Sequence, residues 1–348
     1  MTSTRPRSAG RPTLDEVAAR AGVGRGTVSR VVNGSPQVSP QAREAVRRAI
    51  DELGYVPNRA ARALVTQRTD SVALVVSESE ERLFGEPFFA GIIRGISAEL
   101  MRTPLQLWLA MAQSPEGRQR VEHHLTTQHV DGVMLLSLHD DDPLPAMLAG
   151  RGLPTVLGGR TVNMMRGRPA ATPGPVRFVD MDNEGGARAA VEYLLSAGRR
   201  RIAHVAGTQD MGVGLARVAG YRAALEAAEL PADLVGFGDF REASGAAATR
   251  ELLARAPDLD AVFAASDAMA IGALRALKEA GRRVPDDVAI VGFENSAASG
   301  QTDPPLTTVH QSVDRMGREM ARLLIAMIAG EPTDDILLET ELVRRATA

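Results

Sequence analysis

A short segment near the N-terminus carries side chains that could contact DNA. If residues 25–33 form a helix, Val28, Val31 and Val32 share its inner face, and the opposite face holds arginines and short hydrogen-bonding side chains. These outward residues are Arg25, Thr27, Ser29, Arg30 and Asn33. Such side chains suit phosphate oxygens and base edges. The alternative is a generic pair of helices whose polar face is only solvated.

A second group of polar side chains follows predicted strands in the rest of the chain. The group comprises Asp182, Asn183, Gln209, Asp210, Asp267 and Glu294. An acidic residue after a strand can also be a helix N-cap, and for Asp182 and Asp267 both interpretations stay open. Recurrence at several strand ends favours a polyhydroxylated ligand such as a sugar, because its hydroxyls require converging donors and acceptors.

Other kinds of chemistry have little support. The chain has no cysteine, which excludes disulfides, thiolate zinc sites and cysteine nucleophiles. The glycines of residues 22–26 and 212–214 do not complete a dinucleotide-binding loop, and the phosphate loop of nucleotide hydrolases is missing. His123, His124 and His129 have no acidic partner at metal spacing, so they indicate a solvated helix face. We therefore expect no enzyme, no cofactor and no metal site.

The candidate DNA-contacting residues need a compact helical frame. Thr13 and Glu16 have the capping-box spacing that starts a helix, and Gly22 can end it. A second helix over residues 25–33 and a third over residues 40–53 would follow. Two short helices joined by a glycine-containing turn match helix-turn-helix geometry, in which the second helix enters the major groove.

The distribution of charge supports a nucleic-acid partner for this end of the chain. Residues 1–70 contain twelve arginines and six acidic residues, a net charge of +6. The whole chain has a formal net charge of −3, so the remainder has −9. Such an asymmetry is typical of a protein that presents one end to DNA.

After residue 70 the pattern changes to alternating strands and helices. We expect strands at 72–76, 105–111, 132–136, 155–157, 176–179, 202–206, 234–236, 261–265, 288–293 and 335–344. We expect helices at 88–101, 121–129, 143–150, 184–197, 214–229, 242–255, 268–280 and 311–329. This order predicts parallel sheets with helices on both faces. Two such series predict two lobes with a ligand cleft between them, and residues 161–175 read as a surface excursion.

The 348 residues are too many for one ordinary core and suit a small head plus two lobes. No apolar run approaches the ~20 residues needed to cross a bilayer. The first residues lack the apolar centre of a signal peptide, so we expect a cytoplasmic protein whose residues 1–11 form a disordered tail.

The runs TVSRVVNG and ELGYVPNRAARAL, together with the spacing between them, closely resemble the head of the lac-repressor/galactose-repressor (LacI/GalR) family. The resemblance implies that Arg25 and Gly26 choose bases. It also implies DNA contacts at Thr27, Ser29, Arg30, Asn33, Ser39, Tyr55 and Asn58. Residues 58–66 would form the hinge helix, with Leu64 as an apolar wedge in the minor groove.

The resemblance continues through FFAGIIRGI, GVGLARVAGY, SDAMAIGAL, VAIVGFEN and PPLTTVHQ. It implies ligand contacts at Phe88, Phe89, Arg160, Arg217, Phe240, Asp267, Glu294 and Gln311. Asp182 and Gln209 join this set from their places after strands. Ser266 stands where many members carry Asn, and Glu294 where Asp is usual, so the sugar could differ in size or hydroxyl geometry. Arg217 is the residue for which a forked contact with two hydroxyls is most expected.

The family resemblance also implies a domain plan and a function. The plan is a helix-turn-helix domain at 12–57, a hinge helix at 58–66, a first lobe from 71–179 and 312–337, and a second lobe from 180–308 and 338–348. The expected function is a homodimeric transcriptional repressor that binds a pseudo-palindromic double-stranded operator and responds to a sugar in its periplasmic-binding-protein-like core. The alternatives are a ligand carrier of the periplasmic-binding type, which leaves residues 13–64 unexplained, and a sugar-processing enzyme.

Overall fold

The computed structural model describes residues 12–32, 34–56, 68–112, 114–127, 129–140, 142–168 and 174–348. The chain divides into two compact units, Met1–Thr69 and Asp70–Ala348, which we call the head and the core. Within the described ranges, no helix is both long and apolar enough to span a membrane.

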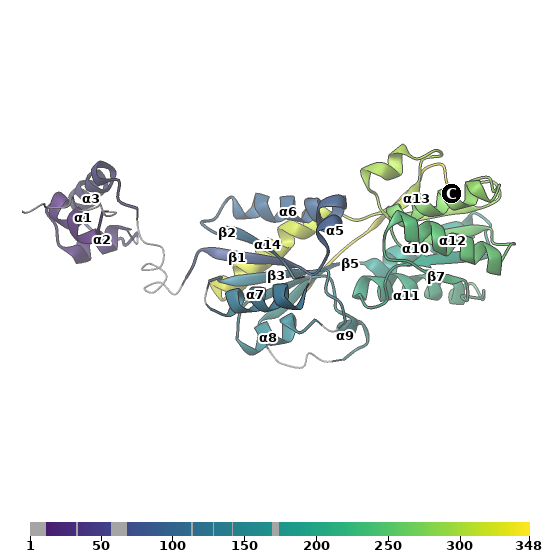
Figure 1. Ribbon diagram of the computed structural model, residues 1–348, viewed down its shortest axis with the longest axis horizontal. Coiled ribbons are helices and arrows are strands. Elements are labelled where there is room, and N and C mark those ends of the chain that lie inside the picture. The colour runs from purple at the N-terminus through teal and green to yellow at the C-terminus, as the bar shows by residue number, and fades with distance from the viewer. Residues whose placement is uncertain are drawn as a thin grey trace, which may run out of the picture. The chain divides into compact units, whose positions relative to one another are not determined.

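The head contains the three predicted helices (Figure 1). They are α1 (Leu14–Ala21), α2 (Arg25–Val32) and α3 (Pro40–Leu53). The capping box of α1 is present, because the Thr13 hydroxyl accepts from the Glu16 amide at 3.3 Å and the Glu16 carboxylate accepts from the Thr13 amide at 2.7 Å. Gly22 ends α1 with a φ of 65°, a conformation that favours glycine. Small apolar side chains, including Val17, Val28 and Val46, fill the space between the helices.

The core contains two six-stranded sheets, which define a first and a second lobe. The first sheet has the order β11-β5-β4-β3-β1-β2, built from β1 (Ser71–Val76), β2 (Gln106–Met111), β3 (Gly132–Leu136), β4 (Thr155–Gly158), β5 (Val176–Met181) and β11 (Ile336–Leu338). The second has the order β12-β10-β9-β8-β6-β7, built from β6 (Ile202–Ala206), β7 (Val235–Phe237), β8 (Ala261–Ala264), β9 (Ala289–Glu294), β10 (Thr307–His310) and β12 (Glu341–Val343). The strands pair in parallel except β10 with β12.

Helices cover both faces of each sheet (Figure 1). Those of the first lobe are α5 (Glu80–Gly85), α6 (Pro87–Leu100), α7 (Pro115–Thr126), α8 (Leu144–Gly150), α9 (Val162–Met165) and α14 (Val313–Ala329). Those of the second lobe are α10 (Asn183–Ser196), α11 (Gly212–Ala227), α12 (Glu242–Arg255), α13 (Asp267–Glu279) and the 3-10 helix η1 (Ala297–Gln301).

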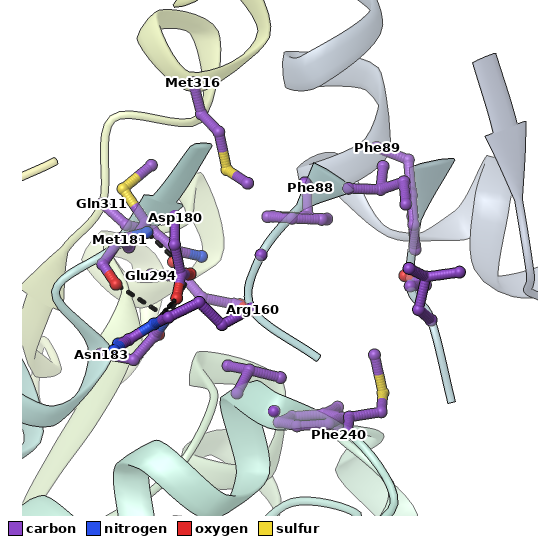
Figure 2. A pocket seen from close by; sticks show the side chains of 18 of the residues that line it. Phe88, Phe89, Arg160, Asp180, Met181, Asn183, Phe240, Glu294, Gln311 and Met316 are labelled. Atoms are coloured by element: carbon purple, nitrogen blue, oxygen red, sulfur yellow. Dashed lines mark hydrogen bonds and ion pairs between the residues drawn. The ribbon is translucent and has the colours of Figure 1, made fainter. Parts of the chain in front are cut away.

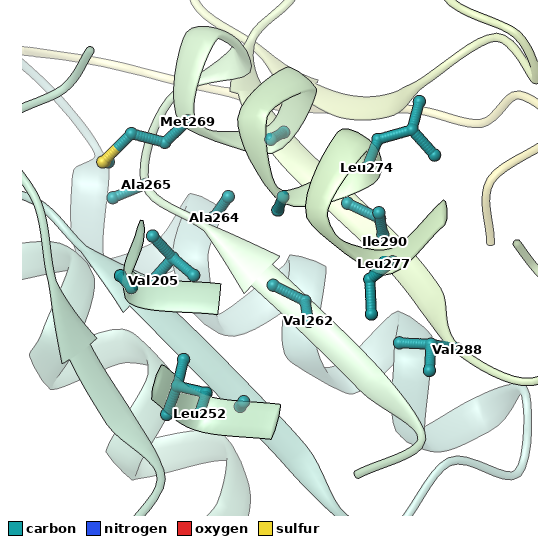
Figure 3. Packing of buried hydrophobic residues seen from close by; sticks show 14 of the residues in the cluster. Val205, Leu252, Val262, Ala264, Ala265, Met269, Leu274, Leu277, Val288 and Ile290 are labelled. Atoms are coloured by element: carbon teal, nitrogen blue, oxygen red, sulfur yellow. The ribbon is translucent and has the colours of Figure 1, made fainter. Parts of the chain in front are cut away.

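The alternation of side chains along each strand produces two apolar layers per lobe. In β1, Val72 and Leu74 pack in the layer under α6 and α14, while Ala73 and Val75 pack in the layer on the other face. A strand covered on both faces must be apolar throughout, which is why these strands read as continuous apolar runs in the sequence. Figure 3 shows one layer of the second lobe, where side chains of α12 and α13 pack against β6, β8 and β9.

The chain passes between the lobes at three places. It leaves the first sheet after β5, returns between β10 and α14, and crosses again between β11 and β12. The long helix α14 follows a strand of the second sheet but packs on strands of the first and on α6. Glycines allow this close packing, because a Cβ atom on Gly95 of α6 would overlap the Asp314 carbonyl of α14.

Most predicted elements are confirmed within a few residues, but the helix expected at 121–129 is α7 at Pro115–Thr126, and other details also differ. Residues 161–175 were expected to be irregular, but they contain α9. The helices α5 and η1 were not expected. Residues 335–344 were expected to be one strand, but β11 and β12 lie in different sheets. The strand β10 was not among the expected strands.

Candidate ligand cleft and DNA-binding face

A cavity lies between the two lobes at the carboxyl ends of their strands. Its volume, including the part open to solvent, is about 770 Å³. Its polar lining includes Arg82, Glu86, Ser137, Arg160, Asp180, Asn183, Arg217, Glu294 and Gln311, and its apolar lining includes Phe88, Phe89, Met211, Phe240 and Met316. Figure 2 shows most of these side chains converging from several elements. A concave site at the strand ends of two α/β lobes is a common place for a small ligand.

Arg217 forms the buried centre of the polar wall. Its side chain projects from α11, and the residue is only 3% exposed. Nε and Nη2 donate to the Asn183 side-chain oxygen at 3.1 and 2.8 Å, and Nη2 also donates to the Gln311 oxygen at 3.3 Å. The guanidinium carbon lies 3.7 Å from the centroid of the Phe293 ring. Burial lowers the pKa of Arg217 to about 10, although nearby carboxylates oppose this shift.

Asp180 orients the neighbouring side chains of this wall. It lies one residue before the end of strand β5, is 5% exposed, and accepts from Arg160 Nε at 2.8 Å. Its other oxygen accepts from the Asn183 amide nitrogen at 3.0 Å. Asn183 in turn holds Arg217, so one hydrogen-bonded chain connects Arg160 of the first lobe to Arg217 of the second. This chain runs through the β5 crossing and holds donors of both lobes at the cavity wall.

Glu294 is the most perturbed carboxyl group of the cavity. Burial, and then the charge of Asp267, raise its pKa to about 8, while Arg217 opposes the shift. Its backbone has a φ of 115°, a conformation that is strained for a residue with a side chain. Two other lining residues, Ser137 and Phe240, also have positive φ angles of 57° and 70°. Backbone strain concentrated around one cavity is typical of a functional site.

Aromatic side chains form the remaining walls. Phe88 and Phe89 of α6 meet edge to face, with ring centroids 5.3 Å apart. Phe240 lies on the opposite side of the cavity from Phe88 (Figure 2). The guanidinium carbon of Arg82 lies 5.9 Å from the Phe240 ring centroid. Flat apolar walls facing each other beside a polar wall suit the apolar faces and hydroxyl edges of a sugar ring.

The structure brings together most of the predicted ligand residues. Those that line the cavity are Phe88, Phe89, Arg160, Arg217, Phe240, Glu294 and Gln311. Asp182, Gln209 and Asp267 do not line it. Asp182 caps α10 by accepting from the Gly185 amide at 2.9 Å, and Gln209 donates to the Gly207 carbonyl at 2.7 Å. Contact between these three residues and a ligand stays a prediction.

Asp267 is buried behind the cavity wall, at 1% exposure. Its carboxylate accepts from the Ser296 amide at 2.6 Å and from the Thr308 hydroxyl at 2.5 Å. It therefore connects the loop after β9 to strand β10, and Glu294 is the last residue of β9 before this loop. Asp267 positions this wall of the cavity and does not line the cavity itself.

Several lining residues were not among the predicted ligand contacts. They include Arg82, Glu86, Ser137, Asp180 and Met316, whereas Asn183, which was expected among the polar residues after strands, does line the cavity. Asp180 had a usable signal, since it lies at the end of a predicted strand. Arg82 and Glu86 had none, because α5 is too short to show a helical period.

Five of the seven predicted DNA contacts that the structure describes lie on the helix α2 of the head. Arg25, Gly26 and Arg30 of α2 are exposed, and Thr27 and Ser29 are half-buried. Arg25 Nε lies 3.6 Å from Asp15, with both side chains about 70% exposed. These residues offer donors on the surface of the second helix, as a recognition helix requires.

Ser39 and Tyr55 have structural positions in the head. The Ser39 hydroxyl caps α3 by accepting from the Ala42 amide at 3.3 Å, and Tyr55 packs in the head core. Asn33, Asn58 and Leu64, with the expected hinge helix, lie outside the described residues. The DNA-contacting roles of all these residues stay predictions.

The comparison with known protein families agrees with this two-part construction. Residues 13–58 match the family described as bacterial regulatory proteins, lacI family, and residues 191–348 match the periplasmic binding protein-like domain. The head and the C-terminal part of the core are thus matched separately. Among the described residues, no group of three His, Asp or Glu side chains could hold a metal ion.

Similar proteins cover nearly the whole chain. The HTH-type transcriptional regulator CelR of Thermobifida fusca is 56% identical over 339 residues, covering 96% of this chain and 98% of that protein. A solved CelR–cellobiose complex is 54% identical, with a TM-score of 0.75 and coverage of 97% and 100%. The lac repressor dimer bound to operator and the anti-inducer ONPF is 28% identical, with a TM-score of 0.82 and coverage of 97% and 99%. The chain therefore belongs to the lacI family of bacterial regulatory proteins and is a DNA-binding transcriptional regulator, not an enzyme.

Proposed function

We propose that this protein is a transcriptional repressor whose operator affinity is set by cellobiose, or a closely related glucose disaccharide, bound between the lobes of the core. The observation that carries the proposal is the composition of the cavity, where Arg217, Asp180 and Glu294 form a polar wall beside Phe88 and Phe240. This set provides both the donors and acceptors that sugar hydroxyls need and the flat surfaces that sugar rings stack against. The similarity to the CelR–cellobiose complex supports the choice of sugar.

The chain crosses between the lobes three times, so a ligand that changes the arrangement of the lobes can affect the head. A ligand held by Arg217 of the second lobe and Arg160 of the first favours one lobe arrangement over the other. It can change operator affinity only by its difference in affinity for the two arrangements. Such couplings are typically about 1–3 kcal/mol.

We infer that the active form is a homodimer that works in the cytoplasm, where operator DNA is found. One head presents one recognition helix, and a pseudo-palindromic operator has two half-sites. A two-fold symmetric dimer matches this symmetry. The solved lac repressor is a dimer bound to its operator, which supports the same assembly here.

Fluorescence anisotropy with labelled DNA from upstream of the gene tests the proposal. We expect tight binding to one pseudo-palindromic segment and a change of operator affinity of at least about five-fold with saturating cellobiose. Sucrose, which is not a β-linked glucose disaccharide, serves as the control sugar. No change with cellobiose or with a panel of other glucosides would contradict sugar control, while loss of segment preference would contradict operator recognition.

Arg25 provides a separate test of the head. Its side chain lies at the start of α2 and is 72% exposed, and a guanidinium can donate two hydrogen bonds to a guanine edge. We expect Arg25→Ala to relax base preference at one symmetric pair of operator positions by about 1–3 kcal/mol. Binding to a library of operator variants measures this. An equal loss on specific and random DNA would show that Arg25 contacts only phosphate.

A further inference from the structure

Charged side chains meet across the two lobes beside the cavity. His139 follows β3 in the first lobe, and Asp210 lies between β6 and α11 in the second. The His139 Nδ1 atom lies 2.7 Å from an Asp210 carboxylate oxygen. Their chain neighbours Leu138 and Met211 line the cavity, while the two charged side chains are 37% and 52% exposed. The contact therefore lies between the cavity and solvent.

We propose that His139 and Asp210 form an ion pair that bridges the mouth of the cleft, favours the closed arrangement of the lobes and so strengthens binding of the sugar. Neither side chain lines the cavity, so both act through lobe closure and are positioning residues. The pair can form only when β3 of the first lobe and α11 of the second are close together. The free energy of this ion pair therefore adds to the binding free energy of any ligand that contacts both lobes.

A chain of charged groups in the first lobe prepares His139 for this contact. The second ring nitrogen, Nε2, lies 3.8 Å from the Glu78 carboxylate, which is 7% exposed. Arg82 donates to both Glu78 and Glu86, and this contact fixes the position of the Glu78 carboxylate. The imidazole therefore lies between two carboxylates, one from its own lobe and one from the other lobe.

The surroundings of the imidazole favour its charged form. The nearby Glu78 carboxylate raises the pKa of His139 most, burial opposes this, and Asp210 adds to the rise, which brings the pKa to about 9. Burial raises the pKa of Asp210, but the bond and charge of His139 bring it below its usual value. The charged and titratable groups of the surrounding segments are Glu78, Arg82, Glu86, Asp140, Asp142, Arg166 and Asp210.

The bridge predicts a direction for the pH dependence of sugar affinity. Opening the lobes removes Asp210 from His139 and lowers the pKa of the imidazole. Closure then takes up a proton, so the contribution of the bridge is full below the open-state pKa and is lost as the pH rises through about 9. Sugar affinity should thus weaken toward alkaline pH.

Glu294 titrates in an overlapping range, because its pKa is raised to about 8. Its ionisation could also change sugar binding at alkaline pH. The bridge must therefore be measured as a difference between the wild type and a variant in which only the bridge is removed. Asp210→Asn does this, since it keeps the size of the side chain and lies outside the cavity lining.

The experiment measures the dissociation constant of cellobiose by calorimetry at pH 7 and pH 10, on the full chain. The choice of probe rests on the proposed function. At pH 7 we expect Asp210→Asn to weaken binding about two- to five-fold, the range of a half-exposed ion pair. Also at pH 7, Asp210→Glu should recover most of this loss. At pH 10 the wild type and Asp210→Asn should bind cellobiose equally.

A second contact across the lobes supplies a matched control. Arg241 lies 3.9 Å from Glu81, and the Glu81 side chain is 84% exposed. Glu81→Gln should change the dissociation constant less than two-fold, because a long and solvated pair contributes little. Equal binding by the wild type and Asp210→Asn at pH 7, or an equal pH dependence in both, would overturn the proposal.

A measurement without sugar separates this proposal from the proposed function. The chain has no cysteine, so cysteines introduced at Gln119 of α7 and Glu226 of α11 carry spin labels at these two positions alone. We expect the distribution of label distances to shift toward larger separations from pH 7 to pH 10 in the wild type and to be independent of pH in Asp210→Asn. If cellobiose fails to bind but this shift occurs, the bridge stands and the choice of sugar is wrong. If the distances do not respond to pH in either protein, the bridge is wrong.

Discussion

The two lobes shift the pKa of their cavity-lining arginines in opposite directions. In the first lobe, Arg82 is held by the carboxylates of Glu78 and Glu86, and these outweigh burial, so its pKa is raised. In the second lobe, Arg217 donates to amide and carbonyl oxygens, and burial lowers its pKa. Both arginines line the same cavity. The comparison indicates that the charge of Arg82 is already neutralised by carboxylates, whereas the charge of Arg217 can still be neutralised by an interaction with a ligand.

The largest expected effect follows from removing the guanidinium of Arg217. Arg217→Ala should weaken cellobiose binding by about a thousand-fold, or about 4 kcal/mol, because a buried charged donor is lost and its oxygen partners stay buried without it. Operator binding should stay within a few-fold of normal, giving a regulator that no longer responds. Calorimetry and anisotropy measure the two quantities. A variant that loses operator binding and melts early would show that Arg217 is structural.

A buried, neutral histidine of the second lobe predicts acid sensitivity. His204 is completely buried, stacks on Phe263 with centroids 4.7 Å apart, and forms a 2.9 Å hydrogen bond from Nδ1 to the Phe263 carbonyl. Burial lowers its pKa to about 4. The folded state thus resists protonation more than the unfolded chain, whose histidine titrates near 6.5. The stability that neutral His204 contributes is present above pH 6.5 and is lost as the pH falls toward 4.

Between pH 7 and pH 5 this histidine should reduce the free energy of unfolding of the core by about 2 kcal/mol. His204→Asn keeps a donor near the position of Nδ1 and removes the titration, so its loss over the same range should be smaller by that amount. Urea denaturation at both pH values measures the difference. His123→Asn, which changes an exposed histidine, should follow the wild type. Parallel pH profiles for His204→Asn and the wild type would contradict this assignment.

Much of the fold could be predicted because its determinants are local. The Thr13–Glu16 capping box and the Gly22 stop define α1 within eight residues, and continuous apolar runs mark the central strands. The failures are elements without a local signal. The helix α9 has four residues, too few for a helical period. The division of residues 335–344 depends on pairing with β5 in one sheet and β10 in the other, which only the tertiary structure decides.

The site could be predicted only in part for a similar reason. The sequence indicates which residues follow strands, but side-chain direction decides whether they cap a helix or face the cavity. Asp182 caps α10, while Asp180, two residues earlier, lines the cavity and holds Arg160. The cross-lobe pair of His139 and Asp210 joins residues 71 positions apart, and no spacing in the sequence indicates it.

The smallest expected effect compares the two arginines directly in the ligand-free protein. Methionine keeps much of the apolar stem of arginine and removes the charge. Arg82→Met removes the cation that pairs with both Glu78 and Glu86 and leaves Glu78 beside His139, so it should lower the free energy of unfolding of the core by about 1–2 kcal/mol, between the values for exposed and buried pairs. Arg217→Met removes a charge that burial already disfavours, so it should cost less or even stabilise.

Urea denaturation without sugar, monitored on the core, measures both variants. Adding Glu86→Gln to Arg82→Met should restore part of the lost stability, because one of the two opposing carboxylates is gone. The same addition to Arg217→Met should restore nothing, since no hydrogen bond or ion pair joins those two residues in the described structure. If both methionine variants lose equal stability, the two lobes do not differ in how they neutralise their cations. In that case the strong dependence of sugar binding on Arg217 would have to come from the geometry of its hydrogen bonds alone.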